Sequence, residues 1–130
     1  MTRFDAADAA ERRKLFADAI RAHRERGSAF CTLEAERGDE EEDEPVPWVQ
    51  FADRTFNLDC TADELDRLTS LLDDFPEFRV ESMESPEDAD GTNVRVTARS
   101  DVNRLAGFVD RAFAEVYGRP DDYRAWAVTV

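Results

Sequence analysis

One histidine and two cysteines are the residues of this 130-residue chain best suited to act as a base or a nucleophile. His23 stands three residues after Ile20 and seven after Phe16, so on a helix it lies on or beside the apolar face. A histidine in that place can act as a general base near neutral pH. Packing of its ring at the end of the helix is the simpler role, and it is the one we expect.

Cys31 and Cys60 do not form a C-x-x-C pair, and a single histidine does not complete a standard zinc site. Each cysteine falls on the inward face of an expected strand, and no basic neighbour in the sequence would lower its pKa. We therefore predict inert, buried thiols, although adjacent strands would bring the two close together. The sequence predicts no metal site and no cofactor, and it assigns no catalytic residue.

Motifs that bind phosphate or divalent cations are missing from the sequence. The five glycines are scattered singly, and no P-loop, dinucleotide-binding or nucleophile-elbow motif occurs. The acidic run at 39–44 lacks the spaced oxygens and the turn glycine of a calcium loop. A calcium loop aligned on Gly91 would place Pro86 and Thr97 where acidic ligands belong. These absences lower the expectation of an enzyme.

Three segments have the apolar spacing of helices. The first opens with a capping pair and stops at Gly27, and the second opens with the capping box Thr61–Glu64. A third follows Asp101, a good N-cap residue. The helices are expected at 8–26, 61–75 and 101–116.

The remaining segments alternate between apolar and polar residues, as strands do. A tight hairpin is expected at Asp53–Arg54, and Phe78, Val80 and Ser82 are expected to share one face of their strand. The acidic segment 37–47 is expected to be a mobile loop. The strands are expected at 30–36, 48–52, 55–60, 77–82, 93–99 and 123–130.

The predicted order of elements is α-β-β-β-α-β-β-α-β within one α+β domain that spans residues 1–130. Hairpin-type connections favour a mainly antiparallel sheet with the helices on one face. The length is sufficient for a single hydrophobic core. This order of elements resembles the type III secretion chaperone-like fold, which implies a chaperone-like, dimeric protein.

The open face of such a sheet is the candidate binding surface. If Phe56, Leu58 and Val96 face the helices, the residues that alternate with them face away and bring several arginines together. Ordinary pairing of these arginines with acids on neighbouring strands is the alternative role. The candidate binding residues are Trp48, Asn57, Arg79, Arg95, Arg99 and Tyr123.

The charge balance is strongly acidic, with 31 Asp and Glu against 17 Lys and Arg, for a net charge of −14. Lys14 is the only lysine. In these features the chain resembles small uncharacterised haloarchaeal proteins. The Debye length falls from about 8 Å at physiological salt to about 3 Å at 1 M, so molar salt would screen the self-repulsion of so many carboxylates.

The composition also limits location and partners. No run of 18 apolar residues exists, so we expect no membrane span. No apolar signal core follows Met1, so we expect a cytoplasmic protein. The charge argues against double-stranded DNA, while single-stranded RNA, a protein partner and a second copy of the chain remain open. We expect a non-enzymatic binding or protein-interaction module, and the alternative is a small enzyme that uses His23 or a cysteine with carboxylates.

Salt dependence is the first testable consequence. The midpoint of thermal unfolding is expected to rise strongly as KCl is raised from dilute to molar concentration, because screening removes repulsion within the folded state. Circular dichroism at fixed pH measures the midpoint of unfolding at each KCl concentration. A midpoint that does not change with KCl would contradict the halophilic interpretation.

Overall fold

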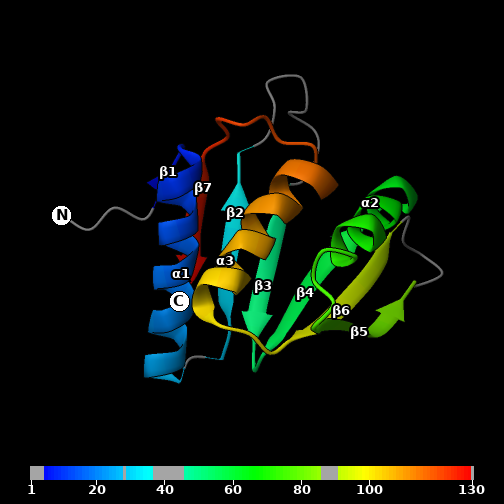
Figure 1. Cartoon of the computed structure of the whole chain (residues 1–130), viewed down its shortest axis with the longest axis horizontal. Helices are drawn as coiled ribbons and strands as arrows, with labels where there is room; N and C mark the ends of the chain where they lie inside the picture. Colours follow the sequence, from blue (N-terminus) through cyan, green and yellow to red (C-terminus); the bar gives the residue numbers. More distant parts are fainter. Residues whose placement is uncertain (1–4, 28, 37–45, 86–90, 130) are drawn as a thin grey trace.

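Three helices cover one face of an antiparallel sheet in the computed structural model, which describes residues 5–27, 29–36, 46–85 and 91–129 (Figure 1). The α+β class and the single domain agree with the sequence prediction. The helical elements are α1 (Ala9–Arg26), α2 (Ala62–Leu72), α3 (Val102–Arg111) and a π-helical turn, η1 (Ala112–Val116), that continues α3.

The sheet has the strand order β1-β7-β2-β3-β4-β6-β5, and every neighbouring pair is antiparallel. The C-terminal strand lies inside the sheet, between β1 and β2. The strands are β1 (Asp5–Ala6), β2 (Cys31–Ala35), β3 (Trp48–Ala52), β4 (Thr55–Cys60), β5 (Phe78–Glu84), β6 (Thr92–Ala98) and β7 (Ala125–Thr129).

The N-terminal caps of the three helices and the stop of α1 lie at the residues that the sequence predicted. The carboxylate of Asp8 accepts a hydrogen bond from the Glu11 amide, and Gly27 closes α1 in the left-handed region at φ 63°. Both hydrogen bonds of the capping box between Thr61 and Glu64 are present. Asp101 caps α3 through the amide of Arg104. Each cap satisfies backbone amides that have no partner within the helix.

Phe108 on α3 stands at the centre of the aromatic core. Its ring centroid lies 5.0 Å from that of Phe56, 5.2 Å from that of Phe75 and 5.1 Å from that of Phe78. These rings come from β4, from the connection between α2 and β5, and from the start of β5, and tilted or edge contacts of this kind stabilise beyond the area they bury. The cluster joins α3 to the β4–β6–β5 half of the sheet.

A buried ionic cluster joins α1 to α3. The Arg12 guanidinium donates through Nε to Asp110 at 2.9 Å and through NH1 to the carbonyl of Tyr123 at 3.0 Å. The Tyr123 hydroxyl donates to the same Asp110 oxygen at 2.8 Å, and the guanidinium carbon lies 3.9 Å from the centre of the Tyr123 ring. The cluster ties α1, α3 and the segment that leads into β7.

The structure departs from the sequence prediction at three places. The two-residue strand β1 was not predicted, because two residues are too few to show alternation. A bulge in β5 puts Ser82 opposite Arg95, on the face opposite to Val80, so the predicted alternation of Phe78, Val80 and Ser82 is wrong. Tyr123 is 2% exposed within the ionic cluster, so its placement on the open face is also wrong. The predicted mobile loop at 37–47 falls largely outside the described residues.

The ionic cluster predicts a large cost for removing its cation. We expect Arg12→Gln to lower the free energy of unfolding by about 3–5 kcal/mol, because Asp110 would lose its buried counter-charge and keep only the half-exposed Arg13, 3.7 Å away. Urea unfolding in molar KCl measures this loss. The matched control is Arg21→Gln, which breaks an exposed pair with Asp18 and should cost less than about 1 kcal/mol. Equal losses in the two variants would contradict the interpretation.

Candidate basic hollow

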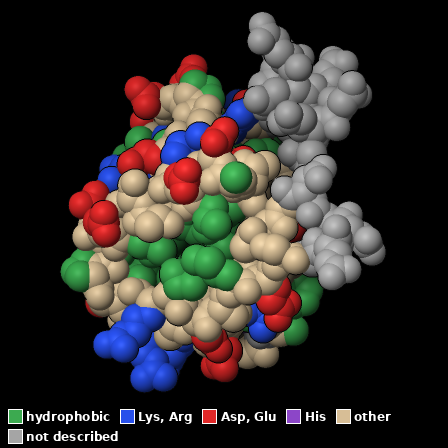
Figure 2. All heavy atoms as spheres, turned by 90° about the vertical axis from the view of Figure 1, so that its right-hand side faces the viewer, with side chains coloured by type: hydrophobic (Ala, Val, Ile, Leu, Met, Phe, Trp, Pro, Cys, Tyr) green, Lys and Arg blue, Asp and Glu red, His purple; other side chains and the backbone are tan. Residues whose placement is uncertain are grey.

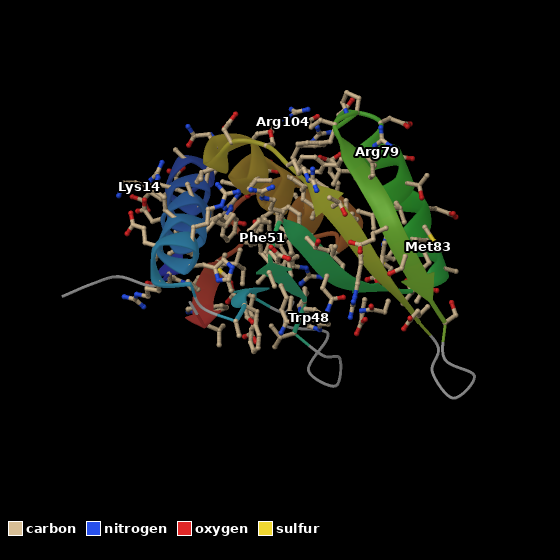
Figure 3. All side chains as sticks on the ribbon, turned by 90° about the horizontal axis from the view of Figure 1, so that it is seen from below. Lys14, Trp48, Phe51, Arg79, Met83 and Arg104 are labelled. Atoms are coloured by element: carbon tan, nitrogen blue, oxygen red, sulfur yellow. The ribbon has the colours of Figure 1, made fainter. Side chains whose placement is uncertain are left out.

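A hollow of about 510 Å³ lies where the C-terminal end of α1, the β3–β4 turn and the connection from β6 to α3 come together. Figure 3 looks at this end of the molecule, with Phe51 near its centre and α1 to one side. We call it the basic hollow. Its lining residues are His23, Arg24, Phe51, Asp53, Arg54, Arg99 and Ser100.

The charges of the basic hollow are opposite to those of the whole chain. Three arginines and one aspartate give it a formal charge of +2 with His23 neutral (3 − 1 = 2), in a chain of net charge −14. Within the described part of the chain, none of the side chains of Arg24, Arg54 and Arg99 forms an ion pair. The hollow therefore presents three guanidinium groups that form no ion pair with any carboxylate of the described residues.

A second hollow contains cations that do form ion pairs. It lies between α1 and α3 and contains Arg13, Lys14 and Arg21. Each of these cations has a carboxylate within 4 Å: Arg13 pairs with Asp110, while Lys14 and Arg21 both pair with Asp18. Surface cations of this fold can thus form ion pairs, whereas the arginines of the basic hollow form none with any residue that the structure describes.

Arg54 reaches the basic hollow from an unfavourable backbone conformation. The β3–β4 turn places Asp53 at φ 48° and Arg54 at φ 64°. This left-handed region is what a two-residue hairpin turn requires, and glycine or asparagine adopts it at least cost. An arginine there has a backbone cost that its own packing does not explain, since its side chain is exposed. Such outliers gather at functional sites.

His23 forms part of the wall of the basic hollow and is 6% exposed. Its ring packs edge-on against Phe51, with 5.9 Å between centroids, and its buried Nδ1 atom has no hydrogen-bond partner among the described residues. Burial, and secondarily the charge of Arg24, lower the pKa of His23 below its ordinary value of 6.5. The imidazole is therefore neutral at neutral pH, and it adds no charge to the site.

Both cysteines are buried and free, as predicted. They lie on β2 and β4, which β3 separates, so the adjacent strands that a disulfide would need are not present. Burial raises the pKa of each thiol to about 12. Neither is a thiolate at neutral pH, and neither lines the basic hollow. No cluster of three or more potential metal ligands occurs among the residues that the structure describes.

The sequence-predicted site residues are divided between different places. Arg99 lies in the basic hollow. Asn57 and Arg95 are opposite each other on β4 and β6 and line a smaller hollow of about 340 Å³ on the open face. Arg79 is exposed on β5, and Trp48, at the start of β3, alternates with the buried Val49.

Sequence reasoning missed Arg24 and Arg54. The two residues are 30 positions apart and come from a helix end and a turn, so no spacing rule joins them. The hairpin prediction at Asp53–Arg54 was the available signal, because an arginine at a position that favours glycine is unusual.

The fold and the hollow together define an α+β protein with a seven-stranded antiparallel sheet and a basic surface site. The chain belongs to the family described as "Family of unknown function (DUF7975)", whose match covers residues 1–130. No curated protein and no solved structure matches the chain. The resemblance to the type III secretion chaperone-like fold therefore gains no support from solved structures. None of the described helices is long and apolar enough to cross a membrane.

The lowered pKa of His23 predicts a pH dependence of stability. Neutral His23 contributes stability that is present above its unfolded pKa of about 6.5 and is lost as pH falls through the lower folded value. The free energy of unfolding should therefore fall more between about pH 7.5 and about pH 5.5 in the wild type than in His23→Gln. Urea unfolding in molar KCl at the two pH values measures the difference. Equal losses of unfolding free energy in the wild type and in His23→Gln would contradict a lowered pKa of His23 in the folded state.

Proposed function

We propose that this protein is a non-enzymatic binding module of a salt-rich cytoplasm, and that its ligand carries a carboxylate or phosphate group held in the basic hollow. The observation that carries the proposal is a group of three arginines that form no ion pair with any described residue, in a chain with 31 acidic residues. Where carboxylates are so abundant, three guanidinium groups that gather around one hollow, with no ion pair among the described residues, favour an anion from outside the chain.

The chemistry of arginine suits a salt-rich solvent. Long-range attraction is lost in molar salt, because the Debye length falls to about 3 Å. A guanidinium in direct contact with a carboxylate or phosphate still forms two parallel, charge-assisted hydrogen bonds. Chloride is spherical and cannot accept such a pair of bonds in the same geometry. The basic hollow should therefore select planar or tetrahedral oxyanions over the chloride that surrounds it.

Other residues of the basic hollow limit the ligand further. Asp53 places one acceptor beside the arginines, and Ser100 supplies a hydroxyl. A ligand with an anionic group and a neighbouring hydrogen-bond donor fits this combination better than a bare anion. The hollow is open to solvent, so the rest of the ligand can extend from it.

The alternative of a small enzyme has less support. His23 and Asp53 line the same hollow, which is the combination that acid–base catalysis needs. However, no hydrogen bond between these two described residues occurs, and Nδ1 of His23 is buried. The raised pKa values of both cysteines remove thiolate chemistry at neutral pH. A binding role accounts for the three arginines of the basic hollow, whereas a catalytic role for His23 or the cysteines does not require them.

Anion titration tests the proposal. We expect inorganic phosphate and citrate, added separately at constant molar KCl, to bind saturably in isothermal titration calorimetry. Arg54→Gly should weaken binding by about tenfold or more, since a hydrogen bond to a charged group contributes about 1.5–3 kcal/mol. The same variant should keep or raise the free energy of unfolding, because glycine adopts φ 64° without the cost of about 1–2 kcal/mol that a side chain brings.

The control is Arg95→Gln, which removes an exposed arginine from the neighbouring hollow and should leave the affinity unchanged. Loss of binding in Arg95→Gln, with normal binding in Arg54→Gly, would move the site to the open sheet face. Absence of saturable binding of either anion to the wild type would overturn the proposal.

A further inference from the structure

The strand β5 closes one end of the sheet, and its outer backbone edge has no strand partner in the described part of the chain. Two of its side chains, Val80 and Met83, are large, apolar and 42% and 49% exposed. Figure 2 views the side of the molecule that carries β5 and α2 and shows hydrophobic side chains gathered in its middle. An open edge beside exposed apolar side chains is a template for pairing with another strand.

The side chains of β5 point to the two faces of the sheet in an order that is the same from residue 79 to residue 84 as from 84 to 79. Val80 and Met83 lie opposite Val96 and Val94, which belong to the core, so both point toward the helix face. Arg79 and Glu84 lie opposite Thr97 and Asn93 on the open face. The bulge puts two consecutive residues, 81 and 82, on the open face as well. From 79 to 84 the faces are therefore open, helix, open, open, helix, open.

This symmetry makes β5 complementary to itself. Two copies paired edge to edge about a two-fold axis must place residues of the same face opposite each other. An axis between residues 81 and 82 satisfies the requirement: Val80 then lies opposite Met83 of the second copy, and Arg79 opposite Glu84. Without the bulge, strict alternation would put these partners on opposite faces.

The charges at the edge agree with the same register. Neither Arg79 nor Glu84 forms an ion pair within the described part of the chain, and in the pair each would meet its opposite charge. Glu81, near the axis, is turned inward, because its carboxylate accepts from the hydroxyls of Thr97 at 3.1 Å and Thr55 at 3.5 Å. Charges on an edge strand normally prevent pairing with another strand. Here the charges of Arg79 and Glu84 favour the register in which each meets its opposite.

We propose that two copies of this chain form a symmetric dimer through antiparallel pairing of β5, with Val80 against Met83 and Arg79 against Glu84 of the second copy. The two sheets then form one continuous sheet, and the exposed apolar side chains of both edges become buried. Figure 3 shows Arg79 and Met83 at different points along β5, as this arrangement needs. None of the residues 79–84 lines the basic hollow, so the dimer leaves that site open.

Oligomeric state in solution tests the dimer. A short paired edge lies at the low end of interface sizes, so we expect sedimentation velocity in molar KCl to show a dimer that dissociates on dilution to roughly micromolar concentration. Val80→Lys should be a monomer throughout the range, because it places a charge opposite Met83. The matched control is Val128→Lys on β7, at a residue that is 53% exposed, and it should remain a dimer. Circular dichroism shows whether each variant is folded.

Charge reversal tests the register. Arg79→Glu and Glu84→Arg should each weaken the dimer by about tenfold, since each creates like-charge contacts at two symmetric places. The double variant should restore most of the affinity, because it exchanges the two charges. A wild type that is monomeric at every concentration, or Val128→Lys alone dissociating the dimer, would overturn the proposal. A double variant no tighter than the single variants would overturn the register. The dimer and the anion site are tested independently, because a monomeric variant such as Val80→Lys should still bind phosphate in the basic hollow.

Discussion

The buried carboxylate of Asp110 is the constraint on which the arrangement of the helices depends. It is 9% exposed and accepts from both Arg12 and Tyr123, while Arg13 lies 3.7 Å from its second oxygen. A charge in this place is tolerated only with its partners present, because a buried ion without a counter-charge costs several kcal/mol. The position of α1 against α3 is thereby fixed, and with it the distance of His23 and Arg24, at the end of α1, from the β3–β4 turn.

The surface shows how a chain with so many carboxylates uses its few cations. Several arginines are held by neighbouring acids, as Arg104 is by Glu77, and that contact lowers the pKa of Glu77 to about 2. Among the described residues, the arginines without an ion pair are Arg24, Arg54 and Arg99 around the basic hollow, Arg79 on the open edge of β5, and Arg26, Arg67 and Arg95 elsewhere. The basic hollow is distinguished by the gathering of three of them at one place. In a protein with an excess of cations, the same side chains would be unremarkable.

Much of the fold could be predicted from local sequence. The caps at Asp8, Thr61 and Asp101 and the hairpin at Asp53–Arg54 each depend on residues within a few positions of one another, and all are present. The bulge in β5 could not be predicted, because the sequence from Phe78 to Ser82 alternates regularly and only pairing with β6 reveals the extra residue. Of the arginines that line the basic hollow, Arg99 was among the sequence-based candidates, whereas Arg24 and Arg54 were not.

The sequence by itself determined the order of the helices and of the six longer strands, the apolar face of these elements apart from β5, and the charge that the fold must tolerate, because these properties follow from residue spacing and composition. Tertiary structure alone decided which polar side chains meet. Tyr123 illustrates the difference: its alternation in the sequence suits an exposed strand position, but Arg12 and Asp110, which come from two helices, provide a buried place for its hydroxyl. Contacts between residues that are far apart in sequence depend on how the helices pack on the sheet. For that reason the ionic cluster and the basic hollow become visible only in the folded chain.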